Sequence, residues 1–150
     1  MNGERQLETA LHKLIGNLFN VYLEAHAAHW NVEGPLFPML HEFFGEFASD
    51  TYGSIDTFAE SLRQHDALAP ANFAQTMKAA SLKEGQATTN AASLLQTLYG
   101  KNHLLLDSLK AVSAAAAAVD DQGLQNFTQE RLYKHLKWDW QFKVQLKRVK

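Results

Sequence analysis

The chain has 150 residues, enough for one domain with a substantial buried core. It contains no cysteine, which excludes disulfides and thiolate metal sites and suits a reducing compartment. The formal net charge of −2 does not by itself favour a nucleic-acid-binding protein.

The charge is unevenly distributed along the chain. Residues 1–66 carry ten acidic and three basic residues, a net charge of −7, whereas residues 67–150 carry six acidic and eleven basic residues, a net charge of +5. This asymmetry is compatible with cation collection, contacts between subunits or weak phosphate binding. No apolar run approaches the ~20 residues of a transmembrane helix, and the N-terminus lacks the features of a signal peptide. We therefore expect a soluble cytoplasmic protein without membrane contact.

The first predicted helix carries apolar residues at alternating intervals of four and three, which is the pattern of an amphipathic helix. These residues are Leu7, Leu11, Leu14, Leu18, Val21, Ala25 and Ala28. Gly34, Pro35 and Pro38 predict its end. The second predicted helix starts between Pro35 and Pro38 and runs to about Gln64.

Residues 66–84 show weak periodicity and contain Pro70, which predicts a long crossover with a short helix over about residues 72–78. Ser81 followed by Glu84 matches a capping box and predicts the start of a third helix that reaches at least Val112. A turn at 120–123 precedes a fourth helix over about residues 124–147.

Four long helices with one long crossover, between the second and third, predict an all-α, ferritin-like four-helix bundle. An up-down-up-down bundle would need only short turns. The chain has no internal repeat and no β pattern, so we expect residues 1–150 to form a single domain.

Four potential metal ligands stand out, namely His29, His41, Asp56 and Glu60. Asp56 and Glu60 are four residues apart and share one face of a helix. His41 precedes Asp56 by fifteen residues, which at about 1.5 Å per residue separates them by roughly 22 Å along the axis. Either these residues are unrelated, or a second, antiparallel copy brings the histidines of one subunit to the acids of the other.

Two imidazoles and two carboxylates suit iron, zinc or manganese, and a mixed nitrogen and oxygen set with open positions favours iron. The alternatives are that Asp56 and Glu60 form an ordinary exposed acidic face, and that His29 is a core histidine. Di-iron centres inside ferritin-like bundles use Glu-x-x-His pairs, and this sequence contains none. A site between subunits remains, and a two-fold axis would supply it in duplicate.

Two stretches also carry a family resemblance, HAAHWNVEGPLFPMLHEFFGEF at 26–47 and SIDTFAESLR at 54–63. They resemble the signature of the Dps family, the starvation-induced DNA-protection proteins of the ferritin-like superfamily. RLYKHLKWDW at 131–140 resembles the pattern of the family's last helix. The resemblance implies a hollow homo-dodecamer that stores oxidised iron and has ferroxidase sites at its two-fold interfaces. It implies that His29 and His41 of one chain and Asp56 and Glu60 of its partner bind Fe²⁺, which peroxide or oxygen oxidises. Trp30 would lie beside the site and intercept radicals.

The chain departs from the family pattern at two places. Gly45 stands where the family commonly has a carboxylate, and Glu46 lies about 100° further around the helix. A lysine-rich N-terminal tail is also missing, although the basic stretch KVQLKRVK at 143–150 could contact phosphate or simply complement the helix dipole. Two alternatives to an iron-storing ferroxidase therefore stay open: a DNA-binding nucleoid protein with secondary iron chemistry, and a structural shell whose metal site has decayed.

Overall fold

The computed structural model describes residues 2–147. Within them the helices are α1 (Gly3–Asn31), α2 (Phe37–Gly53), α3 (Ile55–Gln64), α4 (Phe73–Ala79), α5 (Ala91–Ala118) and α6 (Gln122–Leu146). The only β pairing in this range is an isolated bridge between Glu33 and Asn90. None of the helices in this range combines the length and apolar character that crossing a membrane requires. The predicted all-α class is confirmed.

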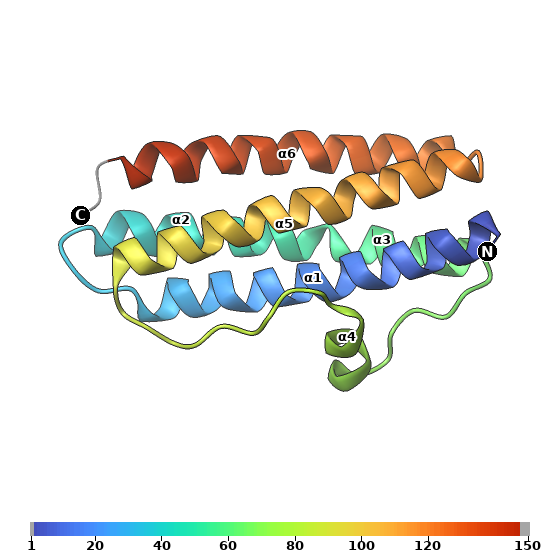
Figure 1. The fold of residues 1–150 in the computed structure, drawn as a ribbon. Helices are drawn as coiled ribbons and strands as arrows, with labels where there is room; N and C mark the ends of the chain where they lie inside the picture. The colour runs from blue at the N-terminus through green and yellow to red at the C-terminus, as the bar shows by residue number, and fades with distance from the viewer. Residues whose placement is uncertain (1, 148–150) are drawn as a thin grey trace.

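Four rods form the bundle, with α2 and α3 lying end to end as one of them (Figure 1). The α2–α3 rod runs antiparallel to α1, and α5 runs in the same direction as α2–α3 (Figure 1). The chain must therefore return along the whole bundle between α3 and α5. This crossover carries α4, which packs against α1 (Figure 1). The predicted ferritin-like topology is confirmed.

The apolar stripe predicted on the first helix lies in the core. Each of its seven members is fully buried: Leu7, Leu11, Leu14, Leu18, Val21, Ala25 and Ala28. Phe44, Phe47, Phe58 and Phe142 are the largest fully buried side chains that face them from the other rods. The burial of large apolar side chains is the main source of stability in such a bundle.

The single helix predicted to run to about Gln64 is two helices. The break falls at Ser54, directly after Gly53, where the Ser54 hydroxyl donates to the Thr51 carbonyl at 2.8 Å. The backbone N–H of Ser54 also bonds the Thr51 carbonyl. This bond from the Ser54 hydroxyl replaces part of the regular helical hydrogen bonding. Serine hydroxyls commonly compete with the backbone in this way.

The predicted helix start at Ser81 is wrong, because the next long helix begins at Ala91 behind the N-cap Asn90. Ser81 instead forms hydrogen bonds with Asn17 of α1. The Asn17 carbonyl oxygen accepts from the backbone N–H groups of Ser81 at 2.9 Å and Leu82 at 3.1 Å. Its amide donates to the hydroxyls of Ser81 at 3.0 Å and Ser108 at 2.8 Å. These bonds hold the crossover in a non-helical course along α1. The short helix predicted within the crossover is confirmed as α4.

His65 joins three elements at one end of the bundle. Its Nδ1 contacts the Glu4 carboxylate of α1 at 2.8 Å, and its Nε2 contacts the Asp121 carboxylate, which caps α6, at 2.8 Å. The hydrogen bond with Asp121 raises the pKa of His65, burial opposes this increase, and Glu4 adds to it. With both ring nitrogens donating to carboxylates, the imidazolium form is the one that fits this position.

We predict that Asn17→Ala lowers the free energy of unfolding by about 2–3 kcal/mol, because buried polar groups of the crossover lose their partner. Urea denaturation followed by circular dichroism measures the change. Asn126→Ala, at an exposed position on α6, is the matched control and should change stability by less than about 0.5 kcal/mol. An equal effect of the two substitutions would contradict the anchoring role of Asn17.

We predict that His65→Asn destabilises the protein more at pH 6 than at pH 9. The pKa of His65 is raised above its ordinary value of 6.5, so its stabilisation is fully present below that value and is lost as the pH rises through the folded-state pKa. Urea denaturation of both proteins at the two pH values measures the difference. A larger loss at pH 9 would reverse the assigned sign.

Candidate metal-binding site

His29 and His41 come together where α1 ends and α2 begins. Their rings stack with centroids 3.7 Å apart and an angle of 16° between the planes. His29 Nδ1 lies 2.5 Å from the carbonyl oxygen of His41, and His41 Nδ1 lies 2.6 Å from the carbonyl oxygen of His29. Each histidine thus orients the other through the backbone.

These two contacts determine the tautomer of both rings. A carbonyl oxygen only accepts, so each Nδ1 must carry the hydrogen, and each neutral ring keeps its lone pair on Nε2. Within residues 2–147, neither Nε2 has a hydrogen-bond partner. Histidines that bind metals usually donate the other ring N–H to a carbonyl or carboxylate in this way. The pair is therefore prepared to offer two nitrogen ligands.

Gly45 provides the space that this arrangement needs. A Cβ atom at position 45 would lie 2.7 Å from His29 Nδ1 and 3.0 Å from its Cε1. Any larger residue would have to displace the ring from its bond to His41. The absence of the carboxylate that the family commonly has here is thus coupled to the position of His29, a relation that the sequence did not reveal.

Aromatic side chains surround the histidine pair. Trp30 stacks on His26 with centroids 4.4 Å apart, His26 lies 5.5 Å from His29, and Phe37 stacks on His41 at 5.0 Å. The Trp30 side chain is 59% exposed, so the ring is accessible beside the pair and not part of the core.

Asp56 and Glu60 lie on α3, and both are exposed. A hydrogen bond to Asp56, together with repulsion between the two carboxyl groups, raises the pKa of Glu60. Two carboxyl groups in contact on one face can accept a cation between them, which would relieve the repulsion. This pair offers oxygen ligands.

The fold does not bring the histidine pair and the acidic pair together. Among residues 2–147, no group of three or more histidine or acidic side chains lies close enough to hold one metal ion. The rod length from His41 to Asp56, about 22 Å, accounts for the separation. One chain therefore contains two incomplete candidate sites.

A groove of about 750 Å³ runs between α1, α2 and the crossover. Among its lining residues, Leu23, Tyr52 and Phe73 are each more than half exposed. Tyr52 stacks on Tyr22 with centroids 4.8 Å apart, and the Tyr22 hydroxyl lies 3.2 Å from His26 Nδ1. An apolar surface thus extends from the C-terminal end of α2 toward the histidine pair.

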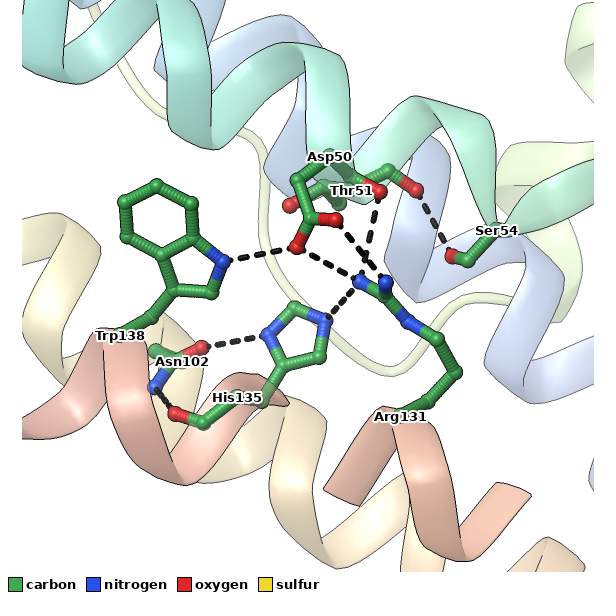
Figure 2. Close-up of polar contacts among 7 residues, drawn as sticks. All are labelled: Asp50, Thr51, Ser54, Asn102, Arg131, His135 and Trp138. Carbon is green, nitrogen blue, oxygen red and sulfur yellow. Dashed lines mark hydrogen bonds and ion pairs between the residues drawn. The ribbon is translucent and has the colours of Figure 1, made fainter. Parts of the chain in front are cut away.

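A second polar cluster, which sequence reasoning missed, lies inside the bundle (Figure 2). Arg131 of α6 makes two bonds of 3.0 Å to the Asp50 carboxylate of α2, and Trp138 donates to the same carboxylate at 2.7 Å. His135 is fully buried between Arg131 and Asn102 of α5 (Figure 2). No spacing in the sequence signals this cluster, because its members come from three helices.

Comparisons with known proteins agree with this fold. The family model of the ferritin-like domain matches residues 8–150. The DNA protection during starvation protein of Brevibacillus brevis is 32% identical over 112 residues, which cover 75% of each chain. General stress protein 20U of Bacillus subtilis is 31% identical over 117 residues, covering 78% of this chain and 81% of that protein.

Solved structures give the same result. The Dps protein from Vibrio cholerae O1, described as a member of a broad superfamily of ferritin-like diiron-carboxylate proteins, has a TM-score of 0.91 and 26% identity, covering 96% of this chain and 91% of that one. The Dps protein from Bacillus brevis has a TM-score of 0.90 and 27% identity, covering 96% and 97%. The chain belongs to the Dps family of the ferritin-like superfamily.

Proposed function

We propose that the protein is an iron-oxidising and iron-storing protein whose ferroxidase site forms between two subunits. His29 and His41 of one chain and Asp56 and Glu60 of its partner would bind Fe²⁺. The observation that carries this proposal is the pair of incomplete sites: two nitrogen ligands where α1 ends and α2 begins, and two carboxyl groups on α3. Family membership supports iron storage and protection in general terms.

A two-fold axis would complete both sites at once. In an isologous dimer the same surface of each chain contacts the other, so an antiparallel arrangement of the two α2–α3 rods brings each histidine pair to an acidic pair. The groove beside α1 and α2 supports this arrangement, because its exposed apolar side chains would be covered by a second copy. The dodecamer implied by the family resemblance would contain such dimers.

The protein groups position Fe²⁺, and the redox chemistry belongs to the iron. Two Fe²⁺ ions reduce one hydrogen peroxide to two water molecules, with two protons taken up, and oxygen is the alternative oxidant. A set of two imidazole nitrogens and two carboxyl groups favours binding of a cation that keeps open positions. With Gly45 in place of an acid, the chain would supply one carboxylate fewer to the bound iron. Trp30, exposed beside the histidine pair, would intercept radicals that escape.

DNA binding is a second candidate function, favoured by the name of the Brevibacillus brevis relative and by the basic second half of the chain. Lys134, Lys137 and Lys143 are exposed on α6, whereas the last three residues of KVQLKRVK lie outside the described residues. A gel-shift assay of the assembled protein at low and high salt tests this candidate. Phosphate contacts would give retardation at low salt that falls steeply with salt.

We predict that His41→Ala, with or without Asp56→Ala, slows Fe²⁺ oxidation at least about tenfold, because each substitution removes a ligand that holds iron at the site. Stopped-flow absorbance of ferric products after adding peroxide, and separately oxygen, measures the rate. His12→Ala, a half-buried position elsewhere on α1, is the control and should leave the rate unchanged. Oxidation by the double variant as fast as by the original chain would reject the site.

We also predict complementation between two inactive chains. One carries His29→Ala and His41→Ala, and the other carries Asp56→Asn and Glu60→Gln. In a mixed dimer, the intact histidines of one chain meet the intact acids of the other, so one of its two sites is complete. Random assembly of equal amounts should restore about a quarter of the original oxidation rate.

The complementation experiment separates the two possible locations of the site. The chains are co-refolded, and the unmixed variants serve as controls. A site built within one chain would leave the mixture as inactive as its components. That outcome would contradict the inter-subunit assignment even if each ligand proved essential.

A further inference from the structure

The partly buried cluster of Figure 2 converges on a single atom, Nη2 of Arg131. This nitrogen lies 3.0 Å from Asp50 Oδ2, 3.3 Å from the Asp50 carbonyl oxygen and 3.1 Å from His135 Nε2. Nη1 of the same guanidinium lies 3.0 Å from Asp50 Oδ1. The carboxylate and carbonyl of Asp50 and the imidazole of His135 thus all contact the same guanidinium group.

The protonation states match those that a metal ion would require. Burial would raise the pKa of Asp50, but hydrogen bonds from Arg131 and Trp138 hold it below its ordinary value. Burial and the Arg131 charge lower the pKa of His135 to about 3. The carboxylate is therefore ionised and the imidazole neutral.

Neighbouring residues fix the orientation of both groups. Asn102 donates its amide to the His135 carbonyl at 2.9 Å, so its own carbonyl oxygen accepts from His135 Nδ1–H at 2.8 Å. This leaves the Nε2 lone pair directed at Arg131 (Figure 2). Trp138 holds the carboxylate from the other side at 2.7 Å. Supporting bonds of this kind orient the ligands of metal sites.

We propose that Arg131 is a permanent internal cation that occupies a metal-binding position inside the bundle, formed by Asp50 and His135, and thereby closes the interior to divalent metal ions. The position lies between α2 and α6, and facing helices of a bundle are where such sites are built. The proposal rests on the proposed function in one respect, since it explains why iron would bind at the subunit interface and not within the chain.

A buried ion pair can also be only structural, and the volume of the side chain at position 131 distinguishes the two readings. Arg131→Ala removes the cation and leaves an opening in front of the Asp50 carboxylate and His135 Nε2. Arg131→Met removes the same charge but fills the opening. Arg131→Lys keeps a cation in place. Closing metal bonds of about 2.0–2.2 Å would require the ligands to move inward by roughly 1 Å.

The experiment uses Co²⁺ as the probe, in chains that also carry His29→Ala and His41→Ala so that interface binding does not contribute. We expect the Arg131→Ala chain to bind one Co²⁺ ion, to show its visible ligand-field bands, and to gain about 5 °C or more in unfolding temperature when Co²⁺ is added. The Arg131→Met and Arg131→Lys chains should bind Co²⁺ at least about tenfold more weakly. Adding His135→Asn to Arg131→Ala should abolish the bands.

Each of the other outcomes decides between the proposal and a purely structural role of Arg131. Equal Co²⁺ binding by the Arg131→Ala and Arg131→Met chains, or none by either, would overturn the proposal and leave Arg131 a structural ion pair. If the Arg131→Ala chain folds only with Co²⁺ present, the metal replaces the guanidinium and the proposal stands. If the Arg131→Ala chain does not fold even with Co²⁺, the proposal fails. Because the interface histidines are absent throughout, failure of the proposed ferroxidase site would not alter these results.

Discussion

An α-helix advances only about 1.5 Å per residue, and this constraint determines what a single chain can do with its candidate metal ligands. The rod formed by α2 and α3 carries His41 near its start and the acidic pair near its end. The small break at Ser54 leaves the two segments end to end (Figure 1). The two incomplete sites therefore stay far apart in one chain, and any shared metal ion requires a second chain.

The two incomplete sites are prepared in different ways. The histidine pair is held by reciprocal bonds from Nδ1 to backbone carbonyls, which fix the tautomer of both rings. The acidic pair is exposed, and contact with Asp56 raises the pKa of Glu60. A cation bound between the chains would contact the oriented histidine pair and would reduce the repulsion between the two carboxyl groups of the acidic pair. The interior of the bundle is different, since there Arg131 already supplies the cation.

Sequence periodicity predicted the long helical segments and the crossover, because α1 and the rod bury stripes that recur every three or four residues, but it did not predict the break at Ser54. It failed at Ser81, where a long-range partner, Asn17, outcompetes the local capping box. Residue type and spacing made His29 and Asp56 candidate ligands, but the sequence could not reveal why position 45 is glycine, since that depends on the His29 ring crossing from another helix. The cluster of Asp50, Arg131 and His135 was likewise invisible, because three-dimensional packing alone brings its members together.

The central claim is that one metal ion is shared between two chains, and anomalous diffraction from crystals of the assembled protein soaked with Fe²⁺ without oxygen tests it most directly. The account predicts an iron peak between His29 and His41 of one chain and Asp56 and Glu60 of its two-fold mate. A peak inside a single bundle, or no peak at the interface at saturating Fe²⁺, would contradict it.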